Sequence, residues 1–169
     1  MSLAGFDKQC TKRIGGVDSL FLARMRDLEA VEYDPSSSVF TSVSLSDGAR
    51  FARFDFREDS CRLYETAARS CGVLSVRHEI AFSLPGNGQG PRKAVSELAG
   101  NGLIAIVLTN EGKALLVGYS HLFRDERPLR LVSFKSSTGF GPEDAPENSI
   151  TLISEDTDLS CPYTGVLPY

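Results

Sequence analysis

The fold is decided by one stretch, NGLIAIVLTNEGKALLVGY, at residues 101–119. Two apolar runs flank a turn at Glu111 and Gly112, and this pattern predicts a β-hairpin. Successive side chains of a strand point to opposite faces of a sheet. The first run is apolar on both faces, at Leu103, Ala105, Val107 and at Ile104, Ile106, Leu108. A half-exposed hairpin would alternate apolar with polar residues, so this one needs cover on both sides, from its own chain or from another subunit.

The rest of the chain is also predominantly β in pattern. The longest alternation runs over residues 74–84, with Val76, His78, Ile80 and Phe82 on one face. Further strands are predicted at residues 19–24, 39–45, 51–57, 129–134 and 149–155. The polar segment between the last two contains two prolines and no apolar periodicity, so it is predicted to be a loop.

One segment has the pattern of a helix. Pro91 follows the breaker-rich GNGQG and suits a first helical position, and Gly100 ends the pattern. The predicted helix spans residues 91–99. The sequence thus predicts a mainly β fold, a β-sandwich or barrel with one short flanking α-helix. Residues 18–169 form its single domain after an N-terminal arm at residues 1–17. In this prediction strand 74–84 covers one face of the hairpin and the helix covers the other.

Length, charge and cysteine content exclude several classes of function. The chain has 169 residues and a net charge of −4. After Lys135 it carries six acidic residues and no Lys or Arg, so the preceding part has a net charge of +2. This balance argues against tight nucleic-acid binding, which requires clustered cations. No secretory signal or membrane span is predicted. The four cysteines, predicted to be free thiols, are Cys10, Cys61, Cys71 and Cys161.

Candidate catalytic residues are few. His78 lies on the apolar face of the longest strand, a position more typical of a core or interface residue than of a catalytic base. His121 lies in a polar stretch and is either an exposed loop residue or a partner of Asp125 or Glu126. No nucleophile motif or metal-ligand spacing accompanies them. We therefore expect no enzyme activity, no catalytic residue, no metal and no cofactor.

The order of these motifs resembles a known group of proteins. CTKRIGGVDSLFLAR near the N-terminus, the long alternating strand, the helix, LIAIVLTNEGKALLVGY and a late strand after a loop containing STG are similar to phage tail tube proteins of Bacteroidetes-type phages and prophages. The resemblance implies a β-sandwich or β-barrel flanked by a helix. It also implies a virion protein, assembled in the host cytoplasm, whose rings are usually hexameric. The rings stack around a channel through which DNA passes without specific binding, and they meet other phage tail proteins.

The leading hypothesis is therefore a self-assembling tail tube subunit. The alternative is a phage adaptor, connector or decoration protein that uses the same β fold without polymerising. In the tube hypothesis a basic strip on one subunit meets the acidic late loop of the next, because opposite charges attract across an interface. The predicted inter-subunit contacts are Arg50, Arg53, Arg57, Glu143, Asp144 and Glu147.

Overall fold

The computed structural model describes residue 5 and residues 13–169, so most of the predicted N-terminal arm lies outside the described residues. The protein is mainly β, with a single α-helix among the described residues, which confirms the predicted fold class. The described part contains no helix that is both long enough and apolar enough to cross a membrane.

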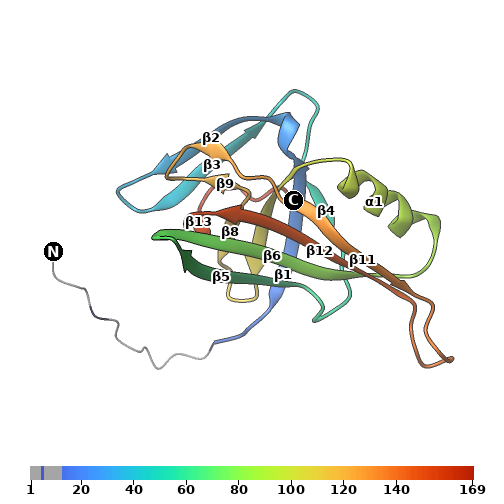
Figure 1. Ribbon diagram of the computed structural model, residues 1–169. Coiled ribbons are helices and arrows are strands. Elements are labelled where there is room, and N and C mark those ends of the chain that lie inside the picture. Colours follow the sequence, from blue (N-terminus) through green and yellow to red (C-terminus); the bar gives the residue numbers. More distant parts are fainter. Residues whose placement is uncertain (1–4, 6–12) are drawn as a thin grey trace.

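Two sheets pack against each other (Figure 1). In sheet order, the seven-stranded sheet consists of β2 (Leu28–Asp34), β3 (Val39–Leu45), β13 (Cys161–Tyr163), β8 (Ala114–Val117), β7 (Leu103–Thr109), β1 (Val17–Arg24) and β4 (Ala52–Phe54). The four-stranded sheet consists of β11 (Arg130–Ser137), β12 (Glu147–Asp156), β6 (Val73–Pro85) and β5 (Arg62–Ser70). A short ribbon pairs β9 (Tyr119–Ser120) with β10 (Asp125–Glu126), and a 3₁₀ turn, η1 (Met25–Asp27), joins β1 to β2. Among the strands of the described residues, only β13 and β3 pair in parallel.

The predicted hairpin at residues 101–119 contains β7 and β8, and both of its faces are buried. Leu103, Ala105 and Val107 pack into a core with the inner face of the four-stranded sheet. The alternate side chains Ile104 and Ile106 enter a second core, formed with Phe40, Tyr163 and other residues of the curled seven-stranded sheet. The second layer is therefore supplied by this chain.

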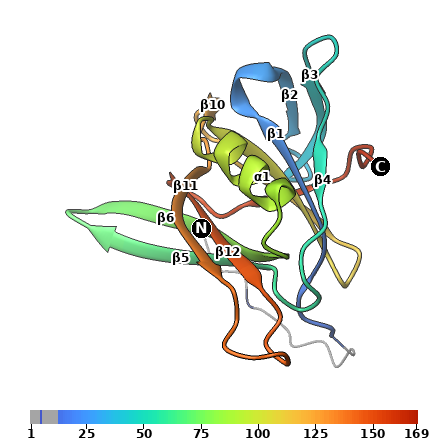
Figure 2. The ribbon, with the colours of Figure 1, turned by 90° about the vertical axis from the view of Figure 1, so that its right-hand side faces the viewer.

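Helix α1 (Gln89–Ala99) corrects one expectation. It was predicted to cover the hairpin face that the long strand leaves open. Instead Leu98, with Ala94 and Val95, packs into the same core as the four-stranded sheet, so helix and sheet cover the same side of β7. Figure 2 shows α1 closing the side of the sandwich between β11 and β4. The β2–β3 hairpin and the C-terminal segment cover the other side, with Val31, Val43 and Leu167 against its core.

The sequence pattern missed two long strands. β2 reads LEAVEYD and β5 reads RLYETAARS, and both contain residues more typical of helices. Each forms a strand because it pairs along its whole length with a neighbour, and such tertiary pairing overrides weak local preference. The predicted strand at residues 51–57 is shorter, only Ala52–Phe54. The predicted late loop is also shorter, because β11 and β12 extend into it as a hairpin.

Candidate assembly surfaces

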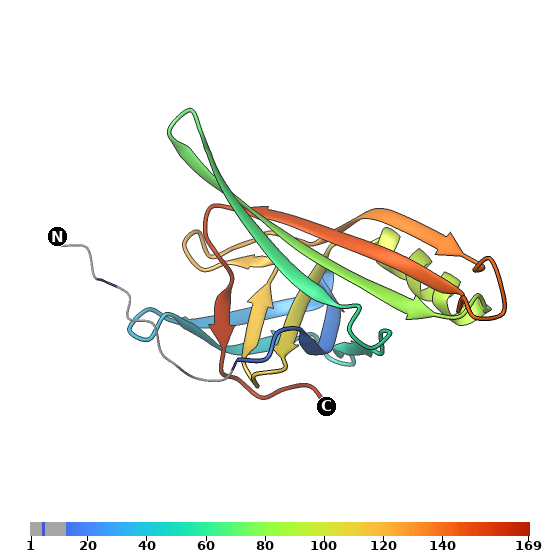
Figure 3. The same cartoon turned by 90° about the horizontal axis from the view of Figure 1, so that it is seen from below.

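The outward face of the four-stranded sheet is a regular surface formed by alternate residues of four strands. Inner positions of β6 are buried from Val76 to Leu84, whereas the alternate positions point outward. No described element lies over this outward face (Figure 3). Its members are rich in small hydroxyl side chains: Thr66, Ser75, Ser83, Ser133, Ser149 and Thr151. We call this surface the hydroxyl face.

Charges on the hydroxyl face are mixed in sign. Arg62 forms an ion pair with Glu79 at 3.5 Å. Arg77 lies directly opposite Glu155 in the register of β6 and β12. A shallow depression of about 460 Å³ lies among Tyr64, Arg77, Glu79 and Glu155. Arg130 and Lys135 also lie on this face, opposite Ile153 and Ser149, and neither forms an ion pair with a described residue. The face therefore carries charges of both signs.

Both edges of this sheet are long. β5 and β11 are the outermost strands, and the described part of the chain places no strand beyond either one. β5 has nine residues and β11 has eight. The free end of the β5–β6 hairpin also extends beyond the body of the protein (Figure 3), where Val73 and Leu74 are exposed. Natural proteins usually shorten or cover such edges, because an unpaired row of N–H and C=O groups accepts another strand.

Three of the six predicted contact residues form ion pairs within the chain, and the other three form none with a described residue. Arg57 and Glu147 form an ion pair within one chain at 3.0 Å, and Arg53 pairs with Asp55 at 3.3 Å. Arg50 forms no ion pair with any described residue and lies beside β4.

The remaining two, Glu143 and Asp144, lie in the exposed loop between β11 and β12. This loop, residues 138–146, is called the tip loop. Arg50 and the tip loop are therefore the parts of the predicted contact that are still available to a neighbour.

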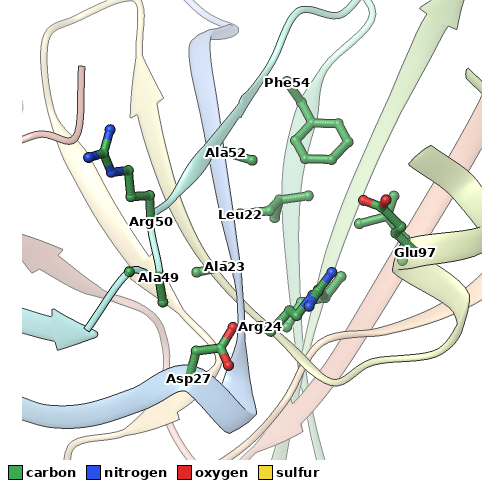
Figure 4. A pocket seen from close by; sticks show the side chains of 12 residues that line it. Leu22, Ala23, Arg24, Asp27, Ala49, Arg50, Ala52, Phe54 and Glu97 are labelled. Atoms are coloured by element: carbon green, nitrogen blue, oxygen red, sulfur yellow. The ribbon is translucent and has the colours of Figure 1, made fainter. Parts of the chain in front are cut away.

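A pocket of about 290 Å³ lies between β1, β4 and the C-terminal end of α1. Its apolar lining comes from Leu22, Ala23, Ala52, Phe54, Leu98 and Leu103. Charged residues surround this lining: Arg24, Asp27, Arg50 and Glu97. Figure 4 shows Arg50 extending outward on one side and Glu97 on the opposite side. We call this the α1–β4 pocket. The sequence pattern did not predict this pocket, because its lining comes from four separate segments of the chain.

His78 lies in a buried polar cluster, as its position on the apolar face predicted. It is 3% exposed, its Nδ1 lies 2.8 Å from Glu65 Oε1, and its Nε2 lies 3.1 Å from the Asp158 carbonyl oxygen. The Ser160 N–H also donates to Glu65. Burial raises the pKa of Glu65, but the hydrogen bonds from His78 and Ser160 outweigh it and leave that pKa below its ordinary value. The cluster fastens the segment after β12 to β5 and β6.

His121 has different partners from those predicted. Its Nε2 lies 3.3 Å from Asp158 Oδ2 and its Nδ1 lies 3.4 Å from Cys161 Sγ, so neither Asp125 nor Glu126 is its partner. Cys161, His121 and Asp158 thus lie next to one another in space. A cysteine, a histidine and an aspartate in such an arrangement can serve as nucleophile, base and orienting acid. However, burial and then the charge of Asp158 raise the pKa of the Cys161 thiol. A nucleophilic cysteine requires the opposite shift, since the thiolate is the reactive form.

Other candidate chemistry is limited in the described ranges. Cys61, Cys71 and Cys161 are free thiols, and Cys10 lies outside the described residues. Burial raises the pKa of Cys61 to about 12, so it is a neutral packing residue. No group of three or more His, Cys, Asp or Glu side chains in residues 13–169 is arranged to hold a metal ion.

Comparison with known proteins identifies no relative. No protein-family model matches the chain, and neither the curated proteins nor the solved structures contain a significant match.

Proposed function

We propose that the protein is a structural virion protein, a tail tube subunit that assembles into stacked rings around a DNA channel. The observation that carries the proposal is the four-stranded sheet, whose two outer strands are long and whose outward face is uncovered. The resemblance to tail tube proteins is the reason for proposing a tube of stacked rings. Within the described part of the chain, the four-stranded sheet has two unpaired edge strands through which neighbouring copies could join.

The two edges favour a ring because they differ. Strand β5 of one copy would pair with strand β11 of the next, a heterologous contact that repeats from copy to copy and closes when the rotation allows. Each copy would contribute its four strands to a shared barrel. Six copies would give a barrel of about 24 strands, and barrels of about 16 to 18 strands already leave an aqueous channel.

The hydroxyl face would then line the channel. DNA binds proteins mainly through Lys and Arg that displace counterions from its phosphates. On this face Arg62 is paired with Glu79 and Arg77 lies opposite Glu155, whereas Arg130 and Lys135 have no ion-pair partner among the described residues and lie five residues apart on β11. Phosphates would therefore meet cations that are either balanced by a carboxylate or separated from one another. Small hydroxyl side chains add no large apolar surface. Such a lining suits passage without specific binding.

The test uses two neighbouring variants of the edge, Thr66→Pro and Ala67→Pro. Backbone N–H groups of adjacent strand residues point to opposite sides, so one proline removes a donor on the free edge and the other removes a donor bonded to β6. The variant that keeps the melting temperature of the parent is the free-edge variant. We expect this variant to stay monomeric in light scattering at concentrations where the parent forms rings.

A parent that is monomeric at every concentration would favour the alternative, a phage adaptor or decoration protein that does not polymerise. Rings that form equally well with the free-edge proline would show that the sheets do not join through β5.

A further inference from the structure

We infer that the α1–β4 pocket receives Phe140 from the tip loop of a second copy of this chain. This inference rests on the proposed assembly and names a contact between neighbouring copies that the sheet edges do not supply. Three features carry the inference: a fully exposed aromatic side chain on a braced turn, a pocket of suitable size, and an excess of negative charge on the loop.

Phe140 is fully exposed, the most exposed large hydrophobic side chain among the described residues. The turn that presents it is braced within the loop. The Phe140 N–H donates to Asp144 Oδ2 at 3.3 Å, and the Asp144 N–H donates to the Gly141 carbonyl at 3.1 Å. Gly139 has a φ of 78°, and a Cβ at this position would collide with the Asp144 carbonyl. The loop thus holds an aromatic ring in water, which has a cost that burial in a partner would remove.

The base of the tip loop is fixed to the body. The Gly86 N–H donates to the Pro146 carbonyl at 3.0 Å, and the Asn148 side chain donates to the Gly86 carbonyl. Gly86 lies just before the N-terminal end of α1, whereas the pocket residues Glu97 and Leu98 lie at its C-terminal end. A helix of this length spans roughly 16 Å. A copy therefore presents its ring away from its own pocket, and the contact must join different copies.

The pocket suits an aromatic ring. Its volume is about 290 Å³, and cavities of about 150 Å³ with apolar linings already accept benzene. Leu22, Phe54 and Leu98 give the ring apolar neighbours. Phe54 adds an aromatic partner, and aromatic pairs favour edge-to-face contact.

The charges on the tip loop and around the pocket determine from which side the loop approaches. The tip loop carries Glu143 and Asp144 without a cation. Neither Arg24 nor Arg50 at the pocket forms an ion pair with any residue in the described ranges, and Asp27 is within 3.6 Å of Arg26. Because Glu97 lies across the pocket from Arg50, the acidic loop is expected to approach from the Arg50 side (Figure 4).

The contact is tested by crosslinking in the full-length protein. A photoreactive benzophenone amino acid replaces Phe140, the concentrated protein is irradiated, and the joined peptides are identified by mass spectrometry. We expect crosslinks between copies to the pocket segments at residues 22–24, 49–54 and 97–103. Crosslinks between copies that map elsewhere, or no crosslink between copies, would overturn the inference.

Variants add a quantitative readout. Phe140→Ser is expected to weaken association roughly 10- to 100-fold, the effect of losing one buried aromatic side chain. The matched control, Phe123→Ser, removes another exposed aromatic residue and should change association less than twofold. Arg50→Glu should weaken association, and mixing it with Glu143→Arg should restore it. Equal effects of Phe140→Ser and Phe123→Ser, or no restoration on mixing, would contradict the contact.

The two proposals fail in different ways. Rings without the pocket crosslink would refute this contact and leave the tube proposal standing. Dimers or open chains with the pocket crosslink would support this contact and refute the closed ring. A monomer at all concentrations without crosslinks between copies would refute both.

Discussion

The buried pair of His78 and Glu65 gives the sharpest test of how the fold is held together. A backbone carbonyl and an ionised carboxylate can only accept hydrogen bonds. His78 Nε2 lies 3.1 Å from the Asp158 carbonyl oxygen and Nδ1 lies 2.8 Å from Glu65 Oε1, so one buried side chain faces two hydrogen-bond acceptors. The imidazole thereby links β6 to β5 and to the segment after β12.

The perturbation is His78→Gln, which keeps a polar side chain but cannot serve both partners with the same geometry. Hydrogen bonds to charged groups contribute about 1.5–3 kcal/mol each. The His78 side chain is only 4% exposed and Glu65 is 23% exposed, so solvent compensates for part of the loss at Glu65 alone. We expect His78→Gln to lower the free energy of unfolding by about 2–3 kcal/mol. For a chain of this size that lowers Tm by roughly 4–12 °C.

The assay is urea unfolding at neutral pH of the parent, His78→Gln, Glu65→Gln and the double variant. We expect a coupling energy of about 1–2 kcal/mol between the two residues, in the range for groups in direct contact. The matched control is Glu79→Gln. Its partner Arg62 is 68% exposed, so this variant should change stability by less than about 1 kcal/mol. A His78–Glu65 coupling below about 0.5 kcal/mol, or an equal loss in the control, would refute the reasoning.

Three further predictions follow from burial and charge. Iodoacetamide should modify exposed Cys71 in the native protein and leave Cys61 unmodified until unfolding, because burial raises the pKa of Cys61 to about 12; equal rates would contradict its burial. Leu152→Ala should lower the unfolding free energy by about 2–5 kcal/mol in urea, since Leu152 is fully buried between the sheets, and a loss below about 1 kcal/mol would contradict close packing. Because the folded pKa of Glu65 lies below its ordinary value of 4.5, its stabilisation is present above pH 4.5 and is lost as the pH falls through the folded pKa. Urea midpoints measured from pH 6 to pH 2 should therefore fall less steeply in Glu65→Gln than in the parent, and parallel curves would contradict this prediction.

The strongest local patterns predicted the fold well. Residues 39–45 were predicted as a strand and form β3 with those bounds, and the alternation over residues 74–84 lies within β6. The doubly apolar strand β7 correctly indicated two layers of cover. These elements were predictable because a buried sheet face requires apolar residues at alternate positions of the strand, and this alternation is visible in the sequence.

The elements that the pattern missed depend on tertiary contacts. In β5, the run ETAAR has no apolar alternation, and its strand is set by pairing with β6 from Arg62 to Ser70. The tight turn after β2 depends on side-chain contacts in the same way, because Asp34 accepts hydrogen bonds from Ser36 and Ser37. Those bonds, led by the one from the Ser36 hydroxyl, lower the pKa of Asp34 to about 2.

The candidate surfaces were only partly predictable. Charge alone indicated a basic strip and an acidic loop, but it could not show that Arg57 and Glu147 would meet within one chain. Cys161 and His121 are forty residues apart in the sequence, so only the fold brings them together. The α1–β4 pocket depends in the same way on how α1 lies beside β4.

Electron microscopy of the concentrated, purified protein tests the proposed function most directly. We expect closed rings or stacked tubes with a central channel from the parent, and single particles of one chain from the free-edge proline variant. Particles of a single chain from the parent at all concentrations, or compact assemblies without a channel, would contradict the proposal that this protein builds a tube.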